Sequence, residues 1–203
     1  MAQFDEQVRE LCGRGEYDQA TTLALRQLGP SIFRYLVARA GDEDLAAQAF
    51  AAFAENLWQG MATFSGRSSL RAWAFAVARN TFGQALRDRW RERRGTEVLS
   101  TTLAGRVAKE VRTETLAYLR TETKERFADL RKTLTSEEQT LLVLRVNERM
   151  SWNEIARIQL DDADAESVKR EAAKLRKQFQ LLRDKLRTLA QEHGLFGDSD
   201  DTP

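Results

Sequence analysis

The sequence has very few of the residues that build metal sites, disulfide bonds and many catalytic centres. Among its 203 residues there is one cysteine, Cys12, and one histidine, His193. A single cysteine excludes an internal disulfide, and one residue of each kind excludes a cluster of cysteine and histidine ligands around a metal. A glycine-rich phosphate-binding loop is also missing, and a lone histidine so near the end of the sequence gives no Ser/His/Asp order. We therefore expect neither an enzyme nor a bound cofactor or metal.

Strand signals and long apolar runs are missing as well. The chain has two prolines, Pro30 and Pro203, and lacks alternating apolar and polar runs. Hydrophobic residues make up 42% and charged residues 31% of a sequence rich in alanine, leucine, arginine and glutamate, which is typical of helices around a packed core. No run approaches the ~18 apolar residues of a membrane span, and the first residues lack the parts of a signal peptide. We therefore predict an all-α, cytoplasmic protein without a membrane contact.

The charge is near zero overall but unevenly distributed. The formal net charge is +1, yet residues 61–94 contain eight arginines against two acidic residues, and residues 168–190 contain eight basic residues against two acidic ones. Two basic blocks suggest two separate contacts with a polyanion, whereas the near-neutral whole argues against a non-specific DNA coat. Composition alone does not choose between such contacts and two solvated helix faces.

Glycine, proline and acidic residues divide the first 60 residues into expected helices. Residues 4–27 should form one or two helices, and Gly29-Pro30-Ser31 should end one helix and start the next, with Ser31 as its cap. The apolar stretch that follows should end near Gly41. The acidic triplet at 42–44 suits a helix start, and that helix should run from 45 to about 58.

The most informative stretch runs from Phe64 to Arg94. Its Ser65-Gly66 pair predicts a turn, and a helix should follow with Ser68 or Ser69 as its N-cap. Helical spacing predicts one buried face on this helix, formed by Leu70, Trp73, Val77, Thr81 and Leu86. Arginines follow the same helix, and flat side chains beside basic ones are typical of a surface that binds nucleic acid.

The C-terminal part predicts three helices joined by short turns, which is the pattern of a helix-turn-helix. Thr135-x-x-Glu138 and Ser151-x-x-Glu154 have capping-box spacing, and a third, basic helix should start around 166 or 167. The first helix should bury a face formed by Leu141, Leu142, Leu144 and Val146. The third carries an apolar seam of heptad spacing, formed by Val168, Ala172, Leu175, Phe179, Leu182, Leu186 and Leu189. The seam predicts packing on the other two helices and then on another segment, such as the linker.

The run Phe64-x-Gly-x-Ser-Ser-Leu-x-x-Trp73, followed by Ala-Arg-Asn80 and an arginine-rich helix end, resembles region two of the extracytoplasmic-function sigma factors. These are small, two-domain members of the sigma-70 family of bacterial transcription initiation factors, and their region two melts and reads the minus-ten element as a single strand. The resemblance implies a base-capturing loop formed by Phe64, Ser65, Gly66 and Arg67. It also implies contacts to the non-template strand, or support of the helix that makes them, by Arg71, Trp73, Arg79 and Asn80. Trp73 is also the strongest core candidate of this set.

A second segment, Glu43-Asp44-Leu-Ala-Ala-Gln48-Ala-Phe50, is similar to the family's Glu-Asp-Leu-Val-Gln-Glu-Val-Phe. In the family this helix docks on the coiled coil of the polymerase β′ subunit. The resemblance therefore implies docking by Glu43, Asp44, Gln48, Phe50 and Asn56. Ala47 and Gln48 stand where the family has a Gln-Glu pair, which changes the detail of the contact.

The C-terminal helices resemble the family's region four, which reads the minus-thirty-five element in the major groove. The matching stretches are 134–139, 151–156 and 167–169. The resemblance implies duplex contacts by Ser167, Lys169, Arg170, Lys174 and Lys177. Two departures imply an unusual promoter preference, a long acidic turn at 158–166 and the pair Glu171-Ala172, where arginine and leucine are frequent.

The resemblance covers about residues 30–94 and 134–190 and implies a two-domain sigma factor. We expect a region 2-like domain at 1–94, a linker at 95–133, a region 4-like domain at 134–193 and an acidic tail at 194–203. The implied partners are core RNA polymerase through its β′ and β subunits and promoter DNA, with an anti-sigma protein as a further candidate. The alternative is a helix-turn-helix regulator that binds DNA without polymerase. A purely structural helical protein would leave both basic blocks unexplained.

Overall fold

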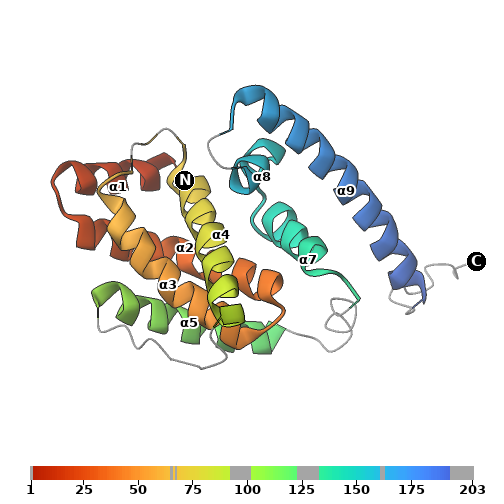
Figure 1. The fold of residues 1–203 in the computed structure, drawn as a ribbon, viewed down its shortest axis with the longest axis horizontal. Coiled ribbons are helices and arrows are strands. Elements are labelled where there is room, and N and C mark those ends of the chain that lie inside the picture. Colours follow the sequence, from red (N-terminus) through yellow and green to blue (C-terminus); the bar gives the residue numbers. More distant parts are fainter. Residues whose placement is uncertain are drawn as a thin grey trace, which may run out of the picture.

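The computed structural model describes residues 2–64, 66, 68–91, 102–122, 133–160 and 163–192. Every element within these ranges is a helix, which confirms the all-α prediction (Figure 1). The elements are α1 (Ala2–Gly13), α2 (Tyr17–Ala40), α3 (Glu43–Met61), α4 (Leu70–Arg91), α5 (Leu103–Glu122), α7 (Ser136–Leu142), the π-helix η1 (Val143–Asn147), α8 (Trp152–Gln159) and α9 (Ala165–Glu192).

The local signals for helix ends are confirmed in the structure. Gly41 ends α2 in the left-handed conformation with φ 63°, and its N–H donates to the carbonyl of Val37. Asp42 caps α3, because its carboxylate accepts a hydrogen bond from the N–H of Leu45 at 2.8 Å. The hydroxyl of Ser69 accepts from the N–H of Ala72 at 3.2 Å and so caps α4. Both predicted capping boxes form, at the starts of α7 and α8.

The predicted helix break at Gly29-Pro30-Ser31 is wrong, because α2 continues through Pro30. Proline lacks the N–H that would bond the carbonyl four residues earlier, and that residue, Arg26, lies at an exposed position. Tertiary packing also supports the uninterrupted helix. A Cβ on Gly29 would lie 2.8 Å from the side chain of Val111 in α5, so glycine permits the close approach of α5.

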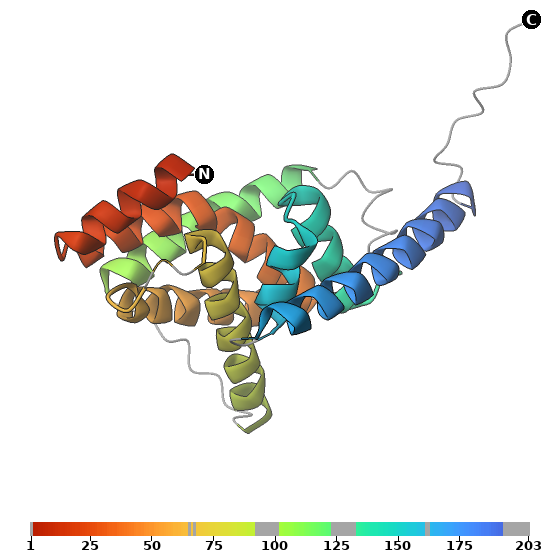
Figure 2. The same ribbon diagram turned by 90° about the horizontal axis from the view of Figure 1, so that it is seen from above.

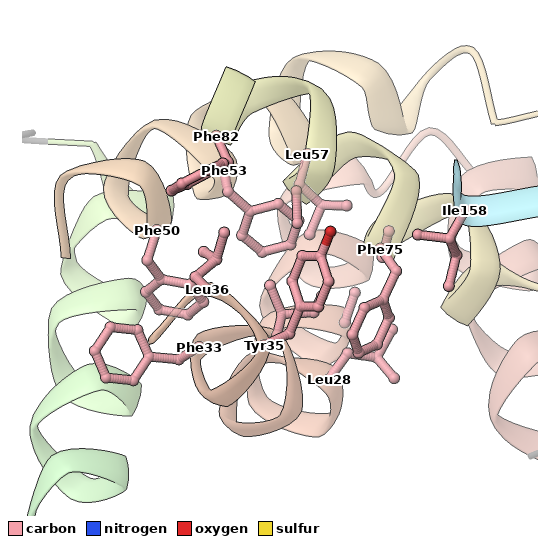
Figure 3. Packing of buried hydrophobic residues seen from close by; sticks show 14 of the residues in the cluster. Leu28, Phe33, Tyr35, Leu36, Phe50, Phe53, Leu57, Phe75, Phe82 and Ile158 are labelled. Atoms are coloured by element: carbon pink, nitrogen blue, oxygen red, sulfur yellow. The ribbon is translucent and has the colours of Figure 1, made fainter. Parts of the chain in front are cut away.

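The core of the N-terminal part lies between α2, α3 and α4, with α1 beside α2. Its largest buried side chains form aromatic contacts, with ring centroids 5.3 Å apart for Phe33 and Phe50 and 5.4 Å apart for Tyr35 and Phe75 (Figure 3). The buried face of α4 carries Leu70, Ala74, Phe75, Ala78 and Phe82. The predicted face is therefore only partly right: Leu70 and Thr81 are buried, Trp73 and Val77 are half-buried, and Leu86 is 38% exposed.

The helix α5 lies inside the segment that we expected to be a linker, and it packs on α2 and α3. Its buried side chains are Ala104, Val107, Ala108, Val111 and Thr115. The first helical body therefore includes residues beyond the boundary at 94. The rest of the expected linker, at 95–101 and 123–132, and the expected acidic tail lie outside the described residues.

The C-terminal helices form the expected three-helix arrangement of α7, α8 and α9. In the first helix Leu141 and Leu144 are buried, but the predicted face does not extend to Val146, which is 55% exposed because the helix changes to π geometry at Val143. The seam of α9 packs on α8 and α7. Its continuation reaches the end of the expected linker, where Leu182 is buried and Lys185 donates to the carbonyl of Thr133 at 3.3 Å.

The N-terminal and C-terminal parts are packed against each other. The two views show α7 and α8 beside α2 and α4, while α9 extends away from the body (Figures 1 and 2). One continuous hydrophobic cluster includes side chains of both parts, among them Leu144, Ile155 and Ile158 from the C-terminal helices. Ile158 of α8 lies beside Phe75 of α4 (Figure 3). Helix α4 is thus the basic helix of the first part, and the C-terminal helix α8 packs directly on it.

Candidate nucleic-acid interface and polymerase-docking helix

The loop before α4 places two of the predicted base-contacting residues side by side. The rings of Phe64 and Trp73 have centroids 5.0 Å apart and an interplanar angle of 38°. Both are partly buried against the core, and a Cβ on Gly60 would lie 3.1 Å from the Trp73 ring. Gly66 has φ 69°, a conformation that favours glycine, as predicted for the turn. Two predicted loop residues, Ser65 and Arg67, lie outside the described residues.

The guanidinium group of Arg71 does not face solvent but a carboxylate of the C-terminal part. Glu148 lies in the turn between η1 and α8, and its side chain is 8% exposed. One carboxylate oxygen accepts from Arg71 Nη2 at 2.9 Å, and the other accepts from Arg34 Nη2 of α2 at 3.0 Å. Arg71 also donates to the backbone carbonyl of Glu148. A buried carboxylate is thus held between two arginines, the geometry in which charge-assisted hydrogen bonds are strong.

Arg79 and Asn80 contact each other and the C-terminal part. The guanidinium of Arg79 donates from Nε and Nη2 to the side-chain oxygen of Asn80, at 3.1 and 2.8 Å. A third nitrogen, Nη1, donates to the backbone carbonyl of Gln159 at the end of α8. Asn80 itself is exposed and Arg79 is half-buried. The structure therefore places Arg71 and Arg79 against the C-terminal helices, whereas Phe64 and Trp73 lie beside Gly60 at the end of α3.

Sequence reasoning missed the partners of these arginines. Arg34, Glu148 and Gln159 were not among the expected site residues, because each lies in a different helix or turn from the arginine-rich segment. Glu148 is 77 positions from Arg71 and 114 from Arg34. Periodicity and capping rules act over a few residues, so no local pattern contains this contact.

The predicted docking residues of α3 have different environments. Glu43, Asp44 and Gln48 are exposed near the start of the helix. Phe50 is 1% exposed and packs between Phe33 and Phe53, so its side chain stabilises the core and does not present a contact surface. The amide of Asn56 donates to the hydroxyl of Thr81 at 2.9 Å and braces α3 against α4. Only the exposed residues are placed to meet a partner directly.

The basic face of α9 is exposed, and its cations lie beside acidic or hydroxyl partners one turn away. Lys169 pairs with Glu166 at 3.9 Å and Lys174 with Glu171 at 3.4 Å. Arg170 donates to the hydroxyl of Ser167 at 3.1 Å, and the side chain of Lys177 is exposed. Surface pairs of this kind contribute little energy and exchange readily with other partners.

The start of α9 has a cap that the sequence analysis did not identify. The carboxylate of Asp164 accepts hydrogen bonds from the N–H of Ser167 at 2.8 Å and from its hydroxyl at 3.1 Å. Both hydrogen bonds lower the pKa of Asp164, and the bond from the backbone N–H of Ser167 has the larger effect. The cap fixes the N-terminal turn of α9, in which Ser167, Lys169 and Arg170 lie.

The residues that the structure describes show no sign of a metal centre or of a membrane span. Within those ranges no three residues among His, Cys, Asp and Glu are grouped so that they could hold an ion. None of the described helices is long and apolar enough to cross a bilayer.

Comparison with known proteins gives one family match, in the N-terminal helices. Neither the curated proteins nor the solved structures gave a significant match to the chain. Residues 24–92 match the sequence model of the family described as Sigma-70 region 2. The matched range begins within α2, includes all of α3 and ends one residue after α4. The helices that carry Arg71, Arg79, the aromatic pair and the exposed acidic start of α3 are therefore similar to the Sigma-70 region 2 family over residues 24–92.

Proposed function

We propose that this protein is a sigma factor of the extracytoplasmic-function type, which binds core RNA polymerase, recognises the minus-ten and minus-thirty-five promoter elements and opens the duplex. The observation that carries the proposal is the Sigma-70 region 2 match over residues 24–92. It coincides with the part of the chain that contains the arginine-rich helix and the acidic helix start of α3. A helix-turn-helix follows in the order that a two-domain sigma factor requires.

The single-strand surface would be formed by the loop and first turns of α4. Phe64, Ser65, Gly66 and Arg67 would capture bases, since Phe64 lies against Trp73 in a turn that glycine permits. Arg71, Arg79 and Asn80 would neutralise phosphates of the non-template strand or support the residues that do. Flat side chains suit this task because every base offers a face for stacking.

The duplex surface would be the N-terminal half of α9. The predicted contacts are Ser167, Lys169, Arg170, Lys174 and Lys177, of which the four cations are exposed. Two capping boxes and the Asp164 cap position the three helices of the helix-turn-helix, and the third helix of such a motif enters the major groove. Domain limits of 1–94 and 134–193 fit this division, although the packing of α5 extends the first body to residue 122.

The polymerase would dock on the exposed start of α3. Glu43, Asp44 and Gln48 offer acidic and amide groups to the β′ subunit, whereas Phe50 and Asn56 would act indirectly by holding α3 in place. An anti-sigma protein is a further candidate partner for the same surfaces. A helix-turn-helix regulator that acts without polymerase is less favoured, because it leaves the region 2 match unexplained.

The test is co-elution of the purified protein with bacterial core RNA polymerase in size exclusion, without DNA. A stable complex is expected. The double variant Glu43→Ala, Gln48→Ala should bind about tenfold more weakly, since it removes contacts at the centre of the proposed interface. The matched control is Gln59→Ala, an exposed residue near the other end of α3. A folded wild-type protein that binds duplex DNA but not polymerase would contradict the proposal and favour the regulator.

A further inference from the structure

The N-terminal and C-terminal parts meet on α2 and on one stripe of α4. Arg71, Phe75 and Arg79 are spaced four residues apart, so they lie along one side of the helix. Phe75 packs beside Ile158, while the two arginines contact Glu148 and the carbonyl of Gln159 on either side of it. The stripe therefore combines an apolar centre with two cationic ends, and the C-terminal part covers all three side chains.

The contact at Glu148 has the chemistry of an anion bound between two guanidinium groups. Arg34 and Arg71 come from different helices, and each gives one nitrogen to a different oxygen of the same carboxylate, at 3.0 and 2.9 Å. Carboxylates and phosphates present similar acceptor oxygens to arginine. Glu148 leaves Arg34 incompletely satisfied, because its Nε is buried without a hydrogen-bond partner among the described residues. A group with more acceptor oxygens could use donors that the carboxylate does not reach.

We propose that Arg34 and Arg71 form a phosphate-binding site, which Glu148 fills while the helix-turn-helix rests on α4 and a DNA phosphate fills when it leaves. The inference rests on the proposed function, since it places the site on the single-strand surface. Arg34 would thus bind DNA together with Arg71, and the helix-turn-helix would compete with DNA for α4. In the closed arrangement neither Arg71 nor the Nη1 of Arg79 is free for the promoter.

The charges make this interface suited to opening. A buried ion pair gains little net stability, because both partners lose hydration that they regain on separation. In a purely apolar interface of the same size, the side chains would regain no favourable hydration on separation, so opening would cost more free energy. The closed form is therefore held by the apolar packing of the C-terminal helices on α2 and α4, where Ile158 and Phe75 belong to one hydrophobic cluster. Glu148 determines which charged groups pair across this interface. A polyanion that offers phosphates to Arg34, Arg71 and Arg79 stabilises the open form by its differential affinity for the two states.

The experiment compares Glu148→Gln with a matched variant, Glu138→Gln, in the full chain. Both replace a paired glutamate by its amide. The side chain of Glu138 is 26% exposed against 8% for Glu148, and Glu138 pairs with Lys185 inside the C-terminal part, at 2.8 Å. Hydrogen exchange without DNA reports docking, through the amides of α4 and α8. Anisotropy of a labelled single-stranded oligonucleotide reports phosphate binding. We expect Glu148→Gln to increase exchange at both helices and to raise oligonucleotide affinity about fivefold or more, and Glu138→Gln to do neither.

The salt dependence tests Arg34 directly. In the Glu148→Gln background, adding Arg34→Gln should reduce the slope of log affinity against log salt by about 0.7, the value for one lost phosphate contact on a single strand. Arg26→Gln, an exposed arginine of the same helix, is the control and should leave the slope unchanged.

Three results would overturn the inference, and they are separable from failure of the proposed function. Unchanged exchange in Glu148→Gln would show that the carboxylate does not specify the closed form. Increased exchange with unchanged oligonucleotide affinity would show that Glu148 does not compete with DNA. An unchanged salt slope on loss of Arg34 would remove the phosphate site. Binding of core polymerase by the wild-type protein in any of these cases would leave the sigma factor proposal standing.

Discussion

The helices α4 and α9 begin from similar sequences but offer their charge in different ways. Each belongs to a block with eight basic and two acidic residues. In the N-terminal half of α9 the cations are exposed, and Lys169 and Lys174 pair with acidic neighbours one turn away. On α4 the inner arginines reach across to groups about 80 positions distant. Charge counts therefore locate a basic surface, but only tertiary packing decides whether a partner can reach it.

The largest expected effect on the free energy of unfolding comes from removing a buried apolar side chain of α4, compared with an exposed one of α9. Phe75 of α4 is completely buried, whereas Leu181 of α9 is 63% exposed. Phe75→Ala should lower the free energy of unfolding by about 3–5 kcal/mol, because it leaves a cavity where α4 meets Tyr35 and Ile158. Leu181→Ala should change it by less than about 0.5 kcal/mol. Urea unfolding measures both, and equal losses would contradict the described packing.

The second comparison removes one cation from each helix. Arg71→Ala leaves the buried Glu148 with only Arg34, so it should cost about 2–3 kcal/mol of unfolding free energy. Lys174→Ala should cost less than about 0.5 kcal/mol, since its pair with Glu171 lies on the surface and its side chain is 63% exposed. Thermal unfolding at two salt concentrations distinguishes them further, because salt screens an exposed pair more than a buried one. A cost for Lys174→Ala as large as that for Arg71→Ala would remove the contrast.

The third change releases strain in the turn that presents Glu148 to α4. Arg149 has φ 52°, and for a residue with a side chain the left-handed conformation costs about 1–2 kcal/mol. Glycine relieves this cost but loses about 0.5–1 kcal/mol through the entropy of the unfolded chain. Arg149→Gly should therefore raise stability by up to about 1 kcal/mol in a urea titration. Gly15, at φ 72° in the exposed turn before α2, offers the inverse control, since Gly15→Ala should be destabilising.

Much of the fold could be predicted because its signals are local. The capping boxes, the turn at Gly66 and the end of α2 at Gly41 depend on residues within one helical turn. The errors arose where distant packing decided the outcome. Pro30 stays inside a helix because α5 packs against the neighbouring glycine. Helical spacing gave Leu86 a buried position on a stripe that the core does not reach.

The candidate site was predictable only in its position on the chain. The residues that carry the resemblance to region two, from Phe64 through α4, fall within the matched range 24–92, and Phe64 lies against Trp73. Arg71 contacts Glu148, in the turn after η1, and Arg79 contacts the carbonyl of Gln159 in α8. Local sequence patterns cannot predict such pairs, because the partners are about 80 positions apart. The same limit applies to Phe50, whose place in the docking segment does not reveal that it is enclosed by α2 and α3.

The smallest expected effect on stability concerns the Asp164 cap at the start of α9, the helix whose basic N-terminal half is exposed. The pKa of Asp164 is lowered from the ordinary value of 3.8 by the hydrogen bonds from Ser167. A carboxylate with a lowered folded-state pKa stabilises the fold above its unfolded pKa, and this contribution is lost as the pH falls through the folded pKa. At neutral pH the cap is therefore fully present, and it weakens below about pH 4. Asp164→Asn keeps a capping oxygen without the charge, so its unfolding midpoint should fall slightly below that of the wild-type protein at pH 7, and the difference should be smaller at pH 3. Urea titrations at both pH values measure this, with Asp184→Asn, an exposed acid in the middle of α9, as the control. A difference in unfolding midpoint that is as large at pH 3 as at pH 7 would mean that Asp164 acts through the shape of the turn and not through its charge. The orientation of the exposed basic face of α9 would then be independent of pH, in contrast to the charge-dependent contact between Glu148 and the arginines of α2 and α4.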